Sequence, residues 1–272
     1  MTTLARQHDL PTPSATGPLT LARRTLALAA LETRIFLRNR TAVVNATLLP
    51  LALAGAFALI GMQGDAARVL PVAMAIASCL IFVVYYSIVG AVVARRQSGV
   101  LKRLLTGTVP RPGILAAGCA PFLALFVAEV ALAVAAVSAL RGAPAHPLII
   151  VLAVLLAGVT WSLLALASTV FTRSVESAQV TTVPLMLGSL LFSGLSLPTA
   201  WMPEPVRVIA ELSPLRPVTD LTWLATTGHA NPEEVFVQGT VWAGIGVEVA
   251  VLLAWALAAT LVLRRFRWEA RV

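Results

Sequence analysis

Two glutamates, Glu129 and Glu248, stand inside long apolar stretches of this 272-residue sequence. A charged carboxylate that faces lipid costs about 2.5 kcal/mol or more, so each side chain should face protein or a water-filled cavity. There it can bind a cationic amphiphile or form a gating contact, or it can make a hydrogen bond between helices that fixes their packing. Because the sequence places no basic residue at the same depth, the packing interpretation is favoured over a substrate or gating role.

Other residue types that carry out chemistry are sparse. His8, His146 and His229 lie in the N-terminal segment or in links between apolar stretches, where they cannot form a Ser-His pair inside a membrane. Cys79 and Cys119 lack metal-ligand spacing and suit small buried packing positions. The sequence also contains no G-x-x-x-x-G-K-S/T phosphate-binding loop. We therefore expect no catalytic residue, no metal site and no bound cofactor on this chain.

The elements that must hold these residues are apolar helices. Hydrophobic residues make up 58% of the chain and charged residues only 12%, against about 45–50% and about 25% in soluble domains. The apolar residues gather in six blocks, each roughly twenty residues long, the length at which a helix crosses a hydrocarbon core of about 30 Å. Backbone groups inside hydrocarbon must bond within their own segment, which helices achieve. We expect an all-α integral membrane protein with transmembrane helices at 41–62, 70–93, 114–140, 148–171, 178–197 and 240–263.

The distribution of basic residues predicts the orientation of these helices. If the N-terminus is cytoplasmic, sixteen of the 20 Lys and Arg residues fall on the cytoplasmic side, where short loops of membrane proteins concentrate them. The four on the outer side are Arg68, Arg141, Arg207 and Arg216. Both termini should therefore be cytoplasmic, in a cell membrane of the bacterial type. The net charge of +8 suits anionic lipid headgroups at the helix ends rather than nucleic acid.

Further segments complete the predicted organisation. Residues 1–18 are polar and contain proline, which is typical of a mobile cytoplasmic tail. Residues 19–40 place three arginines on one side of a helix, as in an amphipathic helix at a membrane interface; a cytoplasmic extension of the first span is the alternative. The transmembrane domain then covers 41–272. Its outer segment, 198–239, is rich in proline, which predicts short half-helices that dip into the outer leaflet.

Residues 95–115, RRQSGVLKRLLTGTVPRPGIL, combine charged residues with a short leucine face between the second and third predicted spans. This segment resembles the cytoplasmic coupling segment of permeases in the type-2 ABC exporter family, which exports drugs, lipids and polysaccharides. The residues that carry the resemblance are Gly99, Leu101, Leu104, Leu105, Pro110 and Arg111. Gln97 and Lys102 depart from it, because that family commonly has Glu at these positions.

The leucines of this segment recur at the spacing of one helix face, and such a face can dock into a groove of a soluble partner. We expect Leu101 and Leu104 to be available to that partner, so that replacing both by Asp removes binding but leaves the fold intact. Arg95 and Arg96 should be rim charges of smaller effect. The alternative is an ordinary basic loop that only sets topology.

A second segment, residues 191–215, has the sequence LFSGLSLPTAWMPEPVRVIAELSPL. It is similar to the same family's pattern of Ser-Gly, an apolar run, Pro, Met-Pro, a short apolar helix and Pro-Leu before the last span. Its matching residues are Ser193, Gly194, Pro198, Met202, Pro203, Pro214 and Leu215. With both segments, the resemblance extends from residue 19 to the C-terminus.

The resemblance implies a permease that works as a homodimer or heterodimer above two ATPase subunits, which bind ATP and Mg. The chain itself would not be an enzyme. We expect its cargo to be a hydrophobic or amphiphilic compound, such as a drug or a lipid-like molecule, because aromatic residues that stack on sugars are few, at 6%. Efflux and drug resistance would follow. A secondary transporter, which would show inverted repeats and helices broken at mid-membrane, and an intramembrane enzyme are the alternatives.

Overall fold

The computed structural model describes residues 18–59, 63–232 and 241–269, and the regular elements within these ranges are all helices, which confirms the predicted all-α fold class. Most of the predicted tail, residues 1–18, lies outside the described residues. In chain order the elements are α1 (Pro18–Arg38), α2 (Arg40–Leu59), α3 (Gly64–Ser78), the π-helix η1 (Cys79–Tyr86), α4 (Ser87–Gln97), α5 (Val100–Leu104), α6 (Arg111–Arg141), α7 (Pro147–Ser168), α8 (Val175–Leu191), the short 3₁₀-helix η2 (Thr199–Trp201), α9 (Glu204–Glu211), α10 (Arg216–Thr227) and α11 (Val241–Leu263).

One long helix forms the centre of the bundle. α3, η1 and α4 continue one another over 34 residues, Gly64–Gln97, and α2, α6, α7 and α10 pack around them. The sequence here is apolar on every side, and Leu80, Val83 and Val84 are fully buried. A helix that is hydrophobic all round can be covered either by other helices or by lipid. In this segment other helices cover it.

The middle of this central helix is wound more loosely than an α-helix. Ser87 Oγ donates to the carbonyl oxygen of Phe82, five residues earlier, at 2.8 Å. Tyr85 packs edge-on against Trp161 of α7, with ring centroids 5.8 Å apart, and its hydroxyl lies 2.8 Å from Ser168 Oγ. The π-helical turns thus attach the central helix to α7 through a large aromatic contact and a polar one.

Among the described residues, four helices are long and apolar enough to cross a membrane: Gly64–Gln97, Arg111–Arg141, Pro147–Ser168 and Gly244–Leu263. They correspond to the second, third, fourth and sixth predicted spans. Helices also stand at the other two positions, but Ala46–Leu59 is the apolar part described for α2, and α8 has only 17 residues. Residues 60–62 and 240, at the edges of the first and last predicted spans, lie outside the described residues. The count of six spans therefore stays a prediction.

α1 crosses one end of α6 and is attached there by close contacts. A Cβ atom on Gly113 of α6 would lie 2.5 Å from Thr25 Oγ1, so glycine allows the two helices to approach closely. Glu32 of α1 also forms an ion pair with Arg95 of α4, at 2.7 Å. α1 is therefore held against the bundle by protein contacts, and its predicted place at a membrane interface stays a prediction.

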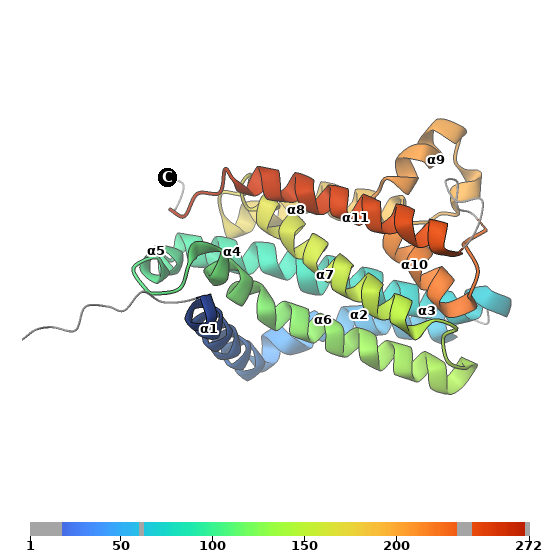
Figure 1. Ribbon diagram of the computed structural model, residues 1–272, viewed down its shortest axis with the longest axis horizontal. Helices are drawn as coiled ribbons and strands as arrows, with labels where there is room; N and C mark the ends of the chain where they lie inside the picture. Colours follow the sequence, from blue (N-terminus) through green and yellow to red (C-terminus); the bar gives the residue numbers. More distant parts are fainter. Residues whose placement is uncertain (1–17, 60–62, 233–240, 270–272) are drawn as a thin grey trace, which may run out of the picture.

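The two ends of the bundle are built differently (Figure 1). α5 and the end of α11 lie at one end, whereas α9 and α10 lie at the other. Between α8 and α11 the chain forms the short helices η2, α9 and α10, as the proline-rich sequence predicts. A proline stands in the first turn of both α9 and α10, where its missing N–H needs no partner. These short helices position the buried charges described next.

Candidate functional site

Five polar residues meet in the interior at the end of the bundle that α9 and α10 form. They are Glu211 at the end of α9, Arg216 and Asp220 in the first turns of α10, Asn231 after α10, and Glu248 in α11, and we call them the charge cluster. Arg216 is fully buried, and the other four are at most 8% exposed. Charged side chains are almost never buried to this degree unless they are paired.

The Arg216 guanidinium pairs with Asp220 and with Glu211. Its Nε lies 2.7 Å from Asp220 Oδ2, and its Nη2 lies 3.3 Å from Glu211 Oε1. Asn231 Nδ2 donates to the other oxygen of Asp220 at 2.6 Å. Carboxyl oxygens of Glu211, Asp220 and Glu248 lie within 4.8 Å of one another, so Glu248 belongs to the same network.

Spacing along the chain explains how one arginine reaches both acids. Arg216 and Asp220 are four residues apart, so their side chains lie on the same face of α10. Pro214 stands in the turn between α9 and α10, and across this turn Glu211 comes back beside Arg216. The proline-broken sequence therefore brings together charges that a continuous helix would distribute along its length.

Gly194, in the turn after α8, gives the Arg216 guanidinium its space. Its φ angle is +78°, a left-handed backbone conformation that favours glycine. A Cβ atom on this residue would collide with Arg216 Nη1. Ser193 ends α8 by donating to the Leu190 carbonyl oxygen at 2.7 Å and accepting from the Leu195 amide at 3.1 Å. The Ser-Gly pair found in the sequence is thus part of the structure that holds the cluster.

The other residues of this second motif set helix boundaries. Pro198 and Met202 flank η2, Pro203 directly precedes α9, and Pro214 lies between α9 and α10. That these residues lie at the outer face of the cell membrane stays a prediction.

Three carboxylates at this spacing could hold a metal ion, but the Arg216 side chain already bonds two of them. Its guanidinium supplies the positive charge that an ion would bring. The charge cluster is therefore an ion-pair network that joins α9, α10 and α11. Removal of one member would leave a buried charge without its partner, which is strongly destabilising.

The expectation that no basic residue lies at the depth of Glu248 is wrong, because Arg216 belongs to the same cluster. α10 carries this arginine into the interior, where its carboxylate partners offset the loss of water. The sequence did contain a signal: Arg216 and Asp220 have the i, i+4 spacing of a helical ion pair, with a further acid just before the intervening prolines.

Glu129 has different partners from Glu248. It is 3% exposed in α6 and accepts a hydrogen bond from Cys79 Sγ of η1 at 3.1 Å. This bond links α6 to the central helix, which is what the packing interpretation expects. A substrate or gating role for either glutamate stays a prediction.

The predicted coupling segment lies at the opposite end of the bundle, where Gly99, with φ of +72°, turns the chain from α4 into α5. Leu101 is 2% exposed and belongs to the hydrophobic core, and Leu104 and Leu105 pack against that core. The expectation of availability is therefore wrong for Leu101, whereas Leu104 and Leu105 are partly exposed and their role toward a partner stays a prediction. α5 has only five residues, and its apolar side packs against the hydrophobic core of this chain. Burial within the chain removes apolar side chains from water just as burial in a partner's groove would.

Polar residues make up most of the outward surface of this segment. Val100, Lys102 and Arg103 of α5 are exposed. Pro110 precedes α6 and Arg111 is its first residue, with its side chain exposed. A partner at this end would therefore meet mainly positive charge.

The rim position predicted for Arg96 is also wrong. This residue is 1% exposed and donates to the carbonyl oxygens of Thr169, at 2.9 Å, and Thr172. The last carbonyl groups of a helix have no partner within it, so Arg96 satisfies the C-cap of α7 at Thr169 and also the turn that follows the helix at Thr172. Arg95 remains partly exposed, in its ion pair with Glu32.

The chain after α11 folds back beside α5. Lys102 Nζ lies 3.2 Å from Glu269 Oε1, and the Arg111 guanidinium lies over the Trp268 ring, 5.9 Å from its centroid. A groove of about 620 Å³ is lined here by Lys102, Leu105, Thr106, Arg111, Arg267, Trp268 and Glu269, and we call it the basic groove.

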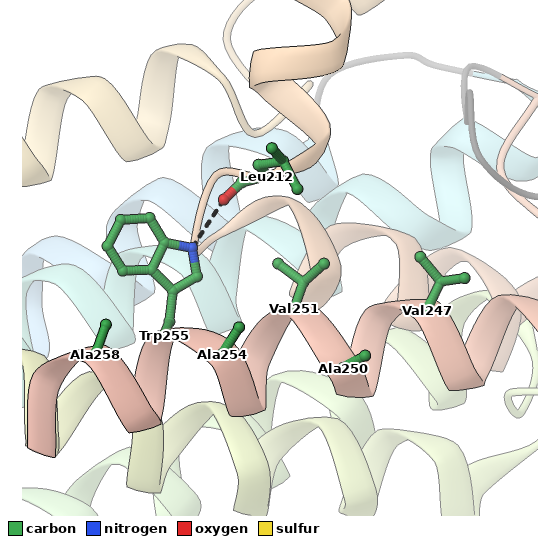
Figure 2. Close-up of a pocket in the computed structure, with 7 residues that line it drawn as sticks. All are labelled: Leu212, Val247, Ala250, Val251, Ala254, Trp255 and Ala258. Atoms are coloured by element: carbon green, nitrogen blue, oxygen red, sulfur yellow. Dashed lines mark hydrogen bonds between the residues drawn. The ribbon is translucent and has the colours of Figure 1, made fainter.

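An apolar groove of about 530 Å³ runs along α11 (Figure 2). Its lining residues are Leu212, Val247, Ala250, Val251, Ala254, Trp255 and Ala258. Trp255 Nε1 donates to the Leu212 carbonyl oxygen at 2.8 Å, which fixes the indole ring at the side of the groove (Figure 2). A second apolar pocket, of about 370 Å³, lies between α6 and α7. Apolar side chains line both of them almost entirely.

The family model for ABC-2 type transporters matches residues 23–222 of this chain. The matched range extends from α1 into α10 and includes both segments that the sequence analysis singled out. A comparison with curated proteins finds no significant match.

Proposed function

The chain belongs to the ABC-2 type transporter family, and from this we propose that it is the permease subunit of an ATP-driven exporter. The observation that carries the proposal is the family match over 23–222, which includes the coupling segment and the proline-broken segment. ATP and Mg would bind to two separate ATPase subunits, because this sequence has no phosphate-binding loop. The chain would then convert movement of the ATPase into movement of its own helices.

In the proposed arrangement α2 and α8 complete a set of six spans, and both termini are cytoplasmic. α5 would face the cytoplasm and the ATPase, and α9 and α10 would lie at the outer face. The excess of Lys and Arg on the α5 side supports this orientation. At about 1.5 Å per residue, α8 would cross most of a hydrocarbon core of about 30 Å, and the turn at Ser193 would continue it.

The proposed cargo is a hydrophobic or amphiphilic compound, such as a drug or a lipid-like molecule. Two apolar cavities support this choice, one along α11 and one between α6 and α7. Their walls are almost entirely aliphatic, which suits hydrocarbon and offers little to a sugar.

A second permease copy, or a paralogue, would complete the transport unit. α8 packs on the bundle along one side, and Val180, Val183 and Leu187 on its other side are 43–73% exposed. Lipid or another helix must cover such a face in a membrane, and a second permease would do so.

Purification from native membranes tests the proposal. The tagged chain should recover an ATPase subunit, identified by mass spectrometry through its phosphate-binding loop. After reconstitution into liposomes, hydrophobic compounds from a chemically diverse panel should stimulate ATP hydrolysis. Transport by the chain alone, driven by a proton gradient and unaffected by ATP, would instead establish a secondary transporter.

A further inference from the structure

The residues that follow α11 are held on the protein surface by several contacts. Backbone amides of Arg265 and Phe266 donate to carbonyl oxygens in the last turn of α11, at 3.0 and 2.9 Å, which turns the chain back. Phe266 and Trp268 pack against the hydrophobic core, with their rings edge-on and 5.2 Å apart. Residues 264–269, which we call the C-terminal tail, therefore have a defined position beside α5.

Two contacts join the C-terminal tail to the coupling segment. The Arg111 guanidinium lies over Trp268, and Lys102 forms an ion pair with Glu269. The side chains of Lys102 and Glu269 are 70% and 74% exposed. An ion pair this exposed contributes little to stability, because water solvates and screens both charges. A carboxylate from another protein can therefore replace Glu269 at little cost.

We propose that α5 and the C-terminal tail form one docking surface for an acidic segment of the ATPase. In the free permease Glu269 pairs with Lys102, and a carboxylate of the ATPase replaces it on binding. This inference rests on the proposed function, since it requires an ATPase partner. The basic groove carries Lys102, Arg111 and Arg267 against the acid Glu269, so its charge complements an acidic segment. Trp268 adds a partly buried aromatic surface of the kind that anchors protein interfaces.

An anionic lipid surface is the competing occupant, and the position of the groove disfavours it. α5 lies at the tip of the bundle, beyond the end of α11 (Figure 1). Residues of α5, of the turn after it and of the C-terminal tail line the groove. A different set of basic residues, Arg23, Arg34 and Arg38, is exposed on α1, which packs against α6. The arginines of α1 can bind anionic lipid headgroups. The groove is lined in part by α5, at the tip of the bundle, where a soluble partner can reach it.

The test uses the full-length permease and the ATPase recovered with it. Purified ATPase would be titrated against wild type, Glu269→Gln, Lys102→Glu and Arg267→Glu in detergent, and Kd measured by microscale thermophoresis. We expect Glu269→Gln to bind about threefold more tightly, because the competing carboxylate is gone, and the two charge reversals to bind about tenfold more weakly. Arg34→Glu makes the same charge change on the exposed side of α1 and should bind like wild type.

Each other outcome overturns the inference in a distinguishable way. A wild-type permease that binds no ATPase removes the proposed function as well. Wild-type affinity in all three groove variants contradicts only the docking surface. Weaker binding by Glu269→Gln contradicts the competing role of that residue. If the charge reversals keep their ATPase affinity but bind phosphatidylglycerol vesicles more weakly, the surface binds lipid. Unfolding temperatures equal to that of wild type would exclude a folding defect.

Discussion

Arg96 and Arg216 show two ways in which this protein buries a guanidinium group. Arg96 donates to backbone carbonyl oxygens at the end of α7, which are neutral groups. Arg216 pairs with carboxylates, which lose their buried counter-ion when the arginine is removed. The loss of Arg216 should therefore be the more damaging of the two, because it leaves unpaired negative charge in the interior.

We expect Arg216→Gln to lower the free energy of unfolding by about 3–5 kcal/mol, because Glu211 and Asp220 lose their counter-ion. Thermal or denaturant unfolding of the purified chain in detergent measures this change. Arg207→Gln is the matched control on α9, since its ion pair with Glu204 has a separation of 3.9 Å and an exposed partner, and it should cost less than about 1 kcal/mol. Equal stability of the two variants would contradict the buried network.

Gly194→Ala should also destabilise the cluster, by about 1–3 kcal/mol, because alanine is strained at this φ angle and its Cβ would displace Arg216. The same unfolding measurement applies. Gly188→Ala in α8 is the control, as a Cβ there meets nothing within 4 Å. If the guanidinium is the cause, Gly194→Ala combined with Arg216→Gln should cost less than the sum of the two single changes. Additive costs would mean that backbone strain alone explains the effect.

At the scale of the elements, the length of an apolar block correctly predicted the long helices that no polar or proline-rich segment interrupts. The blocks at 70–93 and 114–140 lie within Gly64–Gln97 and Arg111–Arg141, because an uninterrupted apolar run in hydrocarbon satisfies its backbone as a helix. Block length did not predict the end of α8. That helix stops at Leu191 rather than residue 197, where Ser193 Oγ donates to the Leu190 carbonyl oxygen and Gly194 takes a left-handed conformation.

The candidate site was harder to predict, because pairing is a property of the folded chain. The family resemblance singled out Gly194, and its apolar surroundings singled out Glu248, but neither signal showed that both residues lie beside Arg216 or its partners. Periodicity likewise identified the apolar side of α5, but it cannot say whether this chain or a partner covers Leu101. The sequence therefore identified candidate residues, but it did not predict which of them contact one another in the folded chain.

The inward leucine face of α5 leads to a prediction about stability. Leu101→Ala should lower the free energy of unfolding by about 2–5 kcal/mol, because it opens a cavity in the core. Val100→Ala, at a position that is 38% exposed on the same helix, should change stability by about 0.5 kcal/mol or less. Unfolding of the chain in detergent, without any ATPase, measures both. Equal stability of the two variants would restore the interpretation that Leu101 serves a partner.

In the whole molecule, the four arginines predicted to face outward all bond within the chain. Arg68 and Arg141 donate to backbone carbonyl oxygens at 2.9 and 3.0 Å. Arg207 and Arg216 pair with acids of α9 and α10. Positive charge at this end therefore has a local structural purpose, whereas many arginines at the α5 end are exposed. This difference strengthens the argument that the exposed ones set the topology.

Cysteine labelling of intact cells tests that orientation. Thr106→Cys lies in the exposed coupling segment, and Ala230→Cys lies in the link after α10. The native Cys79 and Cys119 are 0% and 3% exposed, so they should give little background. We expect a membrane-impermeant maleimide to label position 230 in intact cells and position 106 only after permeabilisation, because exposed arginines near a span are retained on the cytoplasmic side. Labelling of position 106 from outside would show that the topology is the reverse of the predicted one. It would also place α5 and the basic groove away from cytoplasmic ATP, so the ATPase could not dock there.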